Sequence, residues 1–73
     1  MPKLPPLSGG ELIRALERLG FERAGQSGSH VKLRRAGISC IVPLHKAVKK
    51  GTLAGILRQA QLTPDELIQG LAK

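Results

Sequence analysis

The spacing of the apolar residues changes twice along the chain, and this change constrains the fold more than any other feature. Between residues 9 and 19, apolar side chains recur every three or four positions, which is the period of a helix. Between residues 21 and 43 they recur at every second position, which is the period of a strand. From residue 52 onward the helical period returns. The pattern predicts helices on both sides of a block of strands.

The first helix is expected to run from about residue 9 to residue 19. Ser8 followed by Glu11 is the signature of a capping box, and Gly20 suits the C-terminal cap. The apolar stripe of this helix consists of Leu12, Ala15, Leu16 and Leu19. We therefore expect this helix to pack on an apolar surface.

Three strands, separated by short runs rich in Gly, Ser and Ala, are expected at residues 21–25, 30–35 and 38–43. Side chains alternate between the two faces of a sheet. The middle strand therefore places Val31 and Leu33 on one face, and His30, Lys32 and Arg34 on the other. The sheet is predicted to have an apolar side and a cationic side.

A loop over residues 44–50 is expected to lead to a second helix, which Thr52 can cap. The apolar stripe of this helix consists of Leu53, Ile56, Leu57 and Ala60. A short third helix is predicted by Thr63 as N-cap, Pro64 at the first helical position and Glu66 as the capping-box acid. Its apolar residues are Leu67, Ile68 and Leu71.

These elements predict an α+β fold of the order α-β-β-β-α(-α), in which helices and a three-stranded antiparallel sheet form a two-layer sandwich. The order matches that of double-stranded-RNA-binding domains, which favours RNA as a ligand but does not assign a function. A chain of 73 residues has room for one core. We expect a single domain over residues 1–73, with residues 1–7 as an extended N-terminal segment.

The charge is strongly positive and unevenly distributed. Twelve Lys and Arg against five Asp and Glu give a net charge of +7. No acidic residue lies between Arg23 and Pro64, so the middle of the chain is purely cationic. Such a basic zone favours a polyanionic partner, although a solvated surface that only confers solubility is the alternative.

The single cysteine, Cys40, excludes an internal disulfide. Secreted domains of this size usually depend on several disulfides, so the cytoplasm is the expected compartment. Alternation places Cys40 with Ile38 and Val42, and burial as a small apolar residue is expected. The sequence shows neither a signal peptide nor the roughly 20 apolar residues of a membrane span, so no membrane partner is expected.

Imidazole is the side chain whose ordinary pKa best suits proton transfer near neutrality. Of the two histidines, His30 is the better catalytic candidate because it follows a small Gly28-Ser29 turn and lies beside Lys32 and Arg34. A neutral imidazole can take the proton of an RNA 2′-hydroxyl, whose oxygen then attacks the adjacent phosphate. From spacing alone, a strand residue that only contacts phosphate or solvent is an equally good interpretation.

Other residues expected to contact RNA surround His30 or lie near the start of the second helix, where backbone N–H groups favour phosphate. The full set is Gly28, Ser29, Lys32, Arg34, Arg35, His45, Lys46, Lys49 and Lys50. His45 can supply a second proton or a phosphate contact, although a loop histidine more often does neither. Ordinary solvated lysines at a helix cap are an equal alternative for Lys49 and Lys50.

A metal site is not expected. His30, His45 and Cys40 lack the tight paired spacing of metal ligands, and no carboxylate lies near them in the sequence. No other cofactor is indicated either.

Several motifs occur in the order and spacing of a known family. They are Glu11-Leu12-Ile13, Leu19-Gly20-Phe21, Gly28-Ser29-His30, Val42-Pro43-Leu44-His45, Gly51-Thr52-Leu53, Ile56-Leu57-Arg58-Gln59-Ala60 and Leu62-Thr63. Over nearly its whole length the chain resembles the HicA family of toxin endoribonucleases. One departure is Gln61, where the family usually has Gly before the Leu-Thr pair.

The resemblance implies a double-stranded-RNA-binding-like fold and metal-independent cleavage of mRNA, with the catalytic histidine at His30. It also implies a HicB-type antitoxin that binds the toxin, blocks access to the histidine, and acts with it in transcriptional autoregulation. Contact with DNA would then be indirect, through the antitoxin complex. The alternative function is a non-catalytic RNA-binding module of the same fold.

Overall fold

The computed structural model describes residues 6–72. Its helices and strands follow the predicted order and are α1 (Gly9–Arg18), β1 (Glu22–Ser27), β2 (His30–Arg35), β3 (Ile38–Pro43), α2 (Lys50–Ala60) and α3 (Pro64–Ala72). The predicted α+β class is confirmed, with an open antiparallel sheet flanked by helices in the manner of the double-stranded-RNA-binding fold. Most of the expected N-terminal segment, 1–7, lies outside the described residues.

The predicted capping box starts α1. The Ser8 hydroxyl accepts from the Glu11 N–H at 3.1 Å, and the Glu11 carboxylate accepts from the Ser8 N–H at 3.1 Å. Ile13 is buried together with the predicted Leu12, Ala15 and Leu16. The buried stripe is wider than expected because α1 packs against both the sheet and α3.

The sheet has the order β1-β2-β3, and the bounds of β1 correct the prediction of a strand at 21–25. Gly25 does not end the strand, because it takes part in a β-bulge between Arg23 and Gly25 and pairing continues to Ser27. Phe21 precedes the strand and is buried. All six residues of β1 are exposed, so this strand adds little to the core.

The start of α2 also differs from the prediction. Lys49 is the N-cap, with no side-chain hydrogen bond, and its carbonyl accepts from the Leu53 N–H at 2.8 Å. Thr52 therefore lies inside the first turn and does not cap the helix. The predicted apolar stripe is buried, and it consists of Leu53, Ile56, Leu57 and Ala60.

The end of α2 and the start of α3 follow from local chemistry. Gln61 ends α2 in the left-handed region at φ 56°, the conformation in which glycine is favoured. The Thr63 hydroxyl then accepts from the Glu66 N–H at 3.2 Å, and the Glu66 carboxylate accepts from the Thr63 N–H at 2.9 Å. This second capping box confirms the predicted start of α3.

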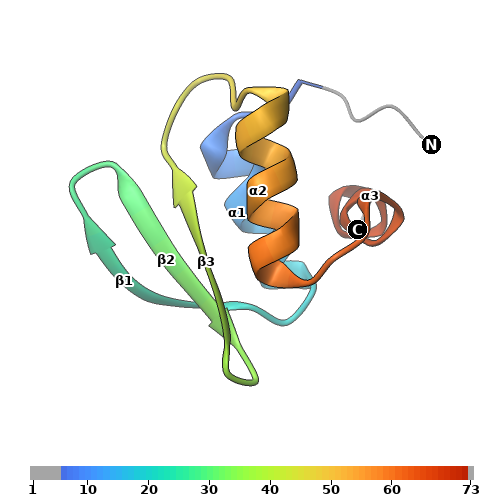
Figure 1. Cartoon of the computed structure of the whole chain (residues 1–73), viewed down its shortest axis with the longest axis horizontal. Coiled ribbons are helices and arrows are strands. Elements are labelled where there is room, and N and C mark those ends of the chain that lie inside the picture. Colours follow the sequence, from blue (N-terminus) through green and yellow to red (C-terminus); the bar gives the residue numbers. More distant parts are fainter. Residues whose placement is uncertain (1–5, 73) are drawn as a thin grey trace.

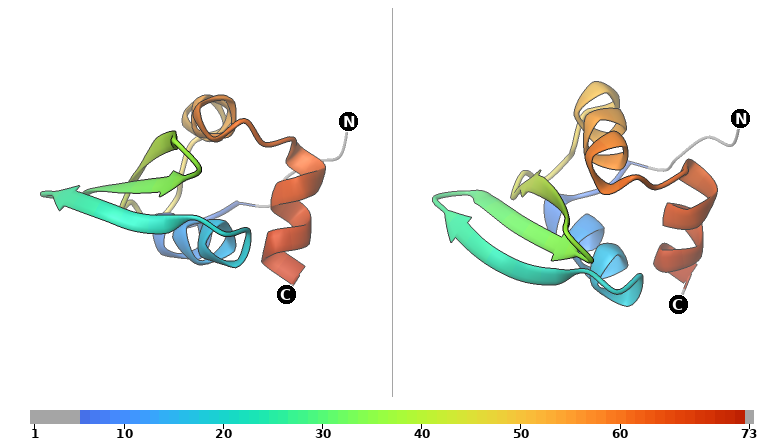
Figure 2. Two further views of the ribbon diagram at one scale, coloured as in Figure 1. Left: turned by 90° about the horizontal axis from the view of Figure 1, so that it is seen from below. Right: turned by 60° about the horizontal axis from the view of Figure 1, so that its bottom comes forward.

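The helices and the sheet are arranged asymmetrically (Figures 1 and 2). The helix α2 runs alongside β3, and α3 lies beyond α1 and α2, on the side away from β1. The β1–β2 hairpin projects in the opposite direction. Gly9, at the start of α1, is pressed so closely against the Pro43 carbonyl that a side chain at this position would collide with it. The close contact joins α1 directly to the end of β3.

The core is almost entirely aliphatic. The α1, α2 and α3 helices contribute leucine, isoleucine and alanine, and Val31, Leu33, Cys40 and Val42 contribute from the sheet. The single aromatic residue, Phe21, is 2% exposed. Among residues 6–72, no helix combines the length and the apolar character needed to cross a membrane.

Candidate functional site

The two faces of β2 differ as the sequence predicts. Val31 and Leu33 are buried, whereas His30, Lys32 and Arg34 are exposed on what we call the open face. Pairing with β3 places Ile41 opposite Lys32, so its side chain lies on the open face as well. This face therefore carries basic groups and an isoleucine.

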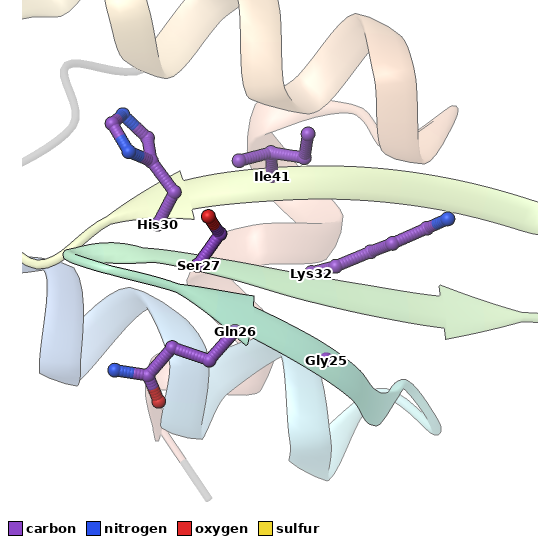
Figure 3. Close-up of a pocket in the computed structure, with 6 residues that line it drawn as sticks. All are labelled: Gly25, Gln26, Ser27, His30, Lys32 and Ile41. Atoms are coloured by element: carbon purple, nitrogen blue, oxygen red, sulfur yellow. The ribbon is translucent and has the colours of Figure 1, made fainter.

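A shallow hollow of about 240 Å³ lies at the His30 end of the sheet (Figure 3). All three strands contribute to it, and its lining residues are Gly25, Gln26, Ser27, His30, Lys32 and Ile41. His30, Ser27 and Ile41 project from the same side of the sheet, whereas Gln26 projects from the other side. The hollow therefore opens beside the imidazole of His30.

Two tight connections position His30 at the start of β2. Gly28, with φ of 59°, takes the first position of the Gly28-Ser29 turn, where a left-handed residue is required, and Ser27 is thereby paired with His30. On the other side, the Leu44 N–H donates to the Ser29 carbonyl at 2.7 Å and ties the turn to the end of β3. The imidazole thus projects from a backbone that is held from both neighbouring strands.

Arg35 has a different position from the other predicted RNA contacts. It shares the face of Val31 and Leu33, its guanidinium lies 4.7 Å from the centre of the Phe21 ring, and it donates to the Leu19 carbonyl at 2.7 Å. This guanidinium is partly buried and is already engaged by the fold.

The remaining predicted residues do not line the hollow. Gly28 and Ser29 form the turn beside it, and Arg34 lies further along the open face. In the loop and at the start of α2 lie His45, Lys46, Lys49 and Lys50, all of which are exposed. The His45 carbonyl accepts from the Gly9 N–H at 2.9 Å. Of the predicted set, the structure brings His30 and Lys32 together in the hollow.

Four lining residues were missed from the sequence: Gly25, Gln26, Ser27 and Ile41. The turns contained a signal for two of them. A two-residue turn at Gly28-Ser29 fixes Ser27 opposite His30, and one at Ala36-Gly37 fixes Ile41 opposite Lys32. Gly25 enters the hollow through the bulge, which the sequence pattern did not indicate.

Among residues 6–72, no group of His, Cys, Asp and Glu is arranged to hold a metal ion. No carboxylate is among the residues that line the hollow. Cys40 lies on the opposite face and is buried, as predicted, and burial raises the pKa of its thiol to about 11. A thiolate nucleophile is therefore disfavoured at neutral pH.

Comparison with models of protein families identifies the family of this chain. The model of the HicA toxin of bacterial toxin–antitoxin systems matches residues 9–62. The chain belongs to the HicA toxin family. Membership implies a partner antitoxin, and the matched range runs from α1 to the end of α2. None of the curated proteins compared with the chain matches it.

Proposed function

We propose that this chain is a metal-independent endoribonuclease that cleaves mRNA, with His30 as its general acid–base catalyst. The observation that carries the proposal is the exposed imidazole of His30 at the edge of a hollow that also contains Lys32. Family membership supports a toxic activity, and the basic middle of the chain supports a polyanionic substrate. DNA lacks the 2′-hydroxyl that the reaction requires, so the mechanism selects RNA.

In the proposed reaction, a neutral His30 takes the proton from a ribose 2′-hydroxyl. The 2′-oxygen forms a bond to the adjacent phosphorus, and the bond from phosphorus to the 5′-oxygen of the next nucleotide breaks. The His30 imidazolium gives its proton, directly or through a water molecule, to the leaving oxygen, so His30 is neutral again and the products are a 2′,3′-cyclic phosphate and a 5′-hydroxyl. Lys32, in the same hollow, stabilises the negative charge that builds up on the phosphate oxygens, and Arg34, further along the open face, adds to the positive potential.

We further propose that the partner is a HicB-type antitoxin that inhibits cleavage by covering the open face. The hollow is shallow and accessible from solvent, so a protein seated there would exclude RNA from His30. The toxin–antitoxin pair would then contact DNA through the antitoxin.

The direct test is cleavage of a single-stranded oligoribonucleotide by the purified chain in the presence of EDTA. Loss of a general base typically costs 10²–10⁴-fold, so His30→Ala should lower the cleavage rate by about that factor. His45→Ala is the matched variant, and because His45 lies outside the hollow we expect less than a tenfold effect. Mass spectrometry should detect the cyclic phosphate. Equal cleavage by wild type and His30→Ala would refute the assignment.

A growth experiment tests the proposed toxicity. Expression of the wild-type chain should arrest a bacterial host, expression of His30→Ala should be tolerated, and co-expression of the antitoxin should restore growth. Equal growth with the wild-type and variant chains, at equal protein levels, would count against a toxic activity of this site.

The alternative, a non-catalytic RNA-binding module, is favoured by one observation. Within the described residues, His30 is the one imidazole that lines the hollow, and no carboxylate there can supply the second proton. Under this alternative, wild type and His30→Ala would both bind RNA and neither would cleave it.

A further inference from the structure

Ile41 is unusual among the aliphatic residues of this protein. Its side chain is 47% exposed, and within residues 6–72 the other large apolar side chain with comparable exposure is Leu44, at 43%. Ile41 lies in the middle of β3 and lines the hollow, whereas Leu44 follows the strand and does not line it. Ile41 therefore supplies an apolar side chain to a hollow that also contains Lys32 and His30.

The fold holds Ile41 through its backbone. The Ile41 N–H donates to the Gln59 Oε1 atom of α2 at 3.2 Å, which attaches β3 to that helix. The neighbours Cys40 and Val42, at 1% and 0% exposure, supply the core contacts of this part of β3. The core therefore does not depend on the side chain of Ile41, and its replacement should lower the free energy of unfolding only slightly.

Two rows of residues cross the open face at the hollow. The strand pairing aligns Gly25, Lys32 and Ile41 in one row, and Ser27 and His30 in the next. Adjacent rows on one face are separated by two residues along the strand, or about 7 Å. An apolar surface, a cation and the imidazole of His30 are thus close enough to contact different parts of a single nucleotide.

We propose that Ile41 and Gly25 form a platform on which one unpaired nucleobase lies, with Lys32 at its phosphate and His30 at its ribose. The proposal rests on the proposed function and specifies its substrate as single-stranded RNA. A base inside a duplex is stacked on both faces and cannot reach the platform, whereas an unpaired base can be turned outward.

The proposed platform is aliphatic, since no aromatic side chain lies on the open face. Phe21, the single aromatic residue in the sequence, is buried under Arg35. Contact with an apolar surface involves the face of a base and not its hydrogen-bonding edges, so the platform should accept different bases. Its role is to position the nucleotide, and it takes no part in proton transfer.

The test measures binding, so that it does not depend on cleavage. The probe is a labelled 2′-O-methyl octanucleotide, which has no free 2′-hydroxyl, and its counterpart is the same backbone without bases. Wild type should bind the base-bearing probe at least tenfold more tightly than the abasic probe. Ile41→Ser should lose most of this difference, while its affinity for the abasic probe should stay within twofold of wild type.

Two further variants complete the test. A side chain added at Gly25 would meet nothing within 4 Å, so Gly25→Val should fold, fill the hollow and weaken binding of the base-bearing probe as Ile41→Ser does. Leu44→Ser is the matched control, since it removes the other exposed apolar side chain outside the hollow, and it should bind both probes like wild type. Thermal melting checks that each variant is folded.

The outcomes separate this inference from the proposed function. If Ile41→Ser binds the base-bearing probe as tightly as wild type, the platform is wrong even if wild type cleaves RNA. A protein partner as the true occupant of the hollow would give that same result. If wild type prefers the base-bearing probe through Ile41 but never cleaves RNA, the platform stands and the assignment of catalysis to His30 fails.

Discussion

The two faces of β2 differ sharply, because one belongs to the core and the other to the proposed site. Val31 and Leu33 belong to the core and are almost completely buried, at 1% and 0% exposure. His30 and Lys32 alternate with them and face solvent beside the hollow. Because neighbouring residues lie in different environments, substitutions one position apart should affect different properties, stability on the buried face and RNA binding on the open face. This comparison makes the role of each face testable.

The largest expected effect on stability is on the buried face. Leu33→Ala removes a fully buried side chain and should lower the free energy of unfolding by about 2–5 kcal/mol. Urea unfolding measures the loss. Because Leu33 does not reach the open face, the variant should still bind RNA under conditions in which it is folded. A loss below 1 kcal/mol would mean that the two faces are less distinct than the exposures indicate.

On the open face, Lys32→Ala should leave stability within about 0.5 kcal/mol of wild type. It should weaken RNA binding and reduce the slope of log affinity against log salt by about 0.7, the value for one phosphate contact on a single strand. Arg14→Ala is the matched control, since it removes the same charge from the exposed side of α1. Equal slopes for both variants would mean that net charge, and not the open face, drives binding.

A smaller effect is expected at the end of α2, away from both faces. Gln61 has a φ of 56°, a conformation that costs a residue with a side chain about 1–2 kcal/mol. Glycine avoids this cost, but its greater conformational entropy in the unfolded chain offsets part of the gain. Gln61→Gly should therefore raise the free energy of unfolding by about 0.5–1 kcal/mol. Gln61→Ala keeps the Cβ atom and should not stabilise the chain. Unchanged RNA binding by Gln61→Gly would confirm that the open face is independent of this cap.

The smallest expected effect concerns the two capping boxes. Hydrogen bonds from the backbone N–H groups of Ser8 and Thr63 hold the pKa values of Glu11 and Glu66 below the ordinary 4.5. Each carboxylate therefore stabilises the fold above that value, and the contribution disappears as pH falls through the lowered pKa. On acidification from about pH 6 to pH 3, the melting temperature of a Glu11→Gln/Glu66→Gln double variant should therefore fall less than that of wild type. Identical pH profiles would contradict this.

Sequence reasoning predicted the features that depend on local chemistry. Both capping boxes, the alternation of β2 and the burial of Cys40 follow from side chains a few positions apart, and all are observed. The predicted start of α2 was wrong. A threonine hydroxyl is a good N-cap in isolation, but the N-cap of the helix is Lys49, which makes no side-chain capping hydrogen bond. The contacts that decide between two such starts are not local.

The hollow shows the same limit. His30 and Lys32 were identified from one strand, but Ile41 and Ser27 join them through pairing between strands, and Gly25 joins through a bulge. Arg35 illustrates the opposite case, because the sequence grouped it with the basic residues while the fold places it against Phe21 and the Leu19 carbonyl. Charge alone did not reveal which cations were already engaged.

The contact between Gly9 and the Pro43 carbonyl has a consequence for how this protein tolerates mutation. Pro43 pairs with His30, so the first turn of α1 rests against the residue of β3 that lies opposite the catalytic candidate. In a saturation mutagenesis experiment scored by growth arrest, we expect every substitution at Gly9 to be as harmful as a substitution at Leu12, although glycine has no side chain to lose. Selection at this position would preserve the close approach of two backbone segments and not a side chain.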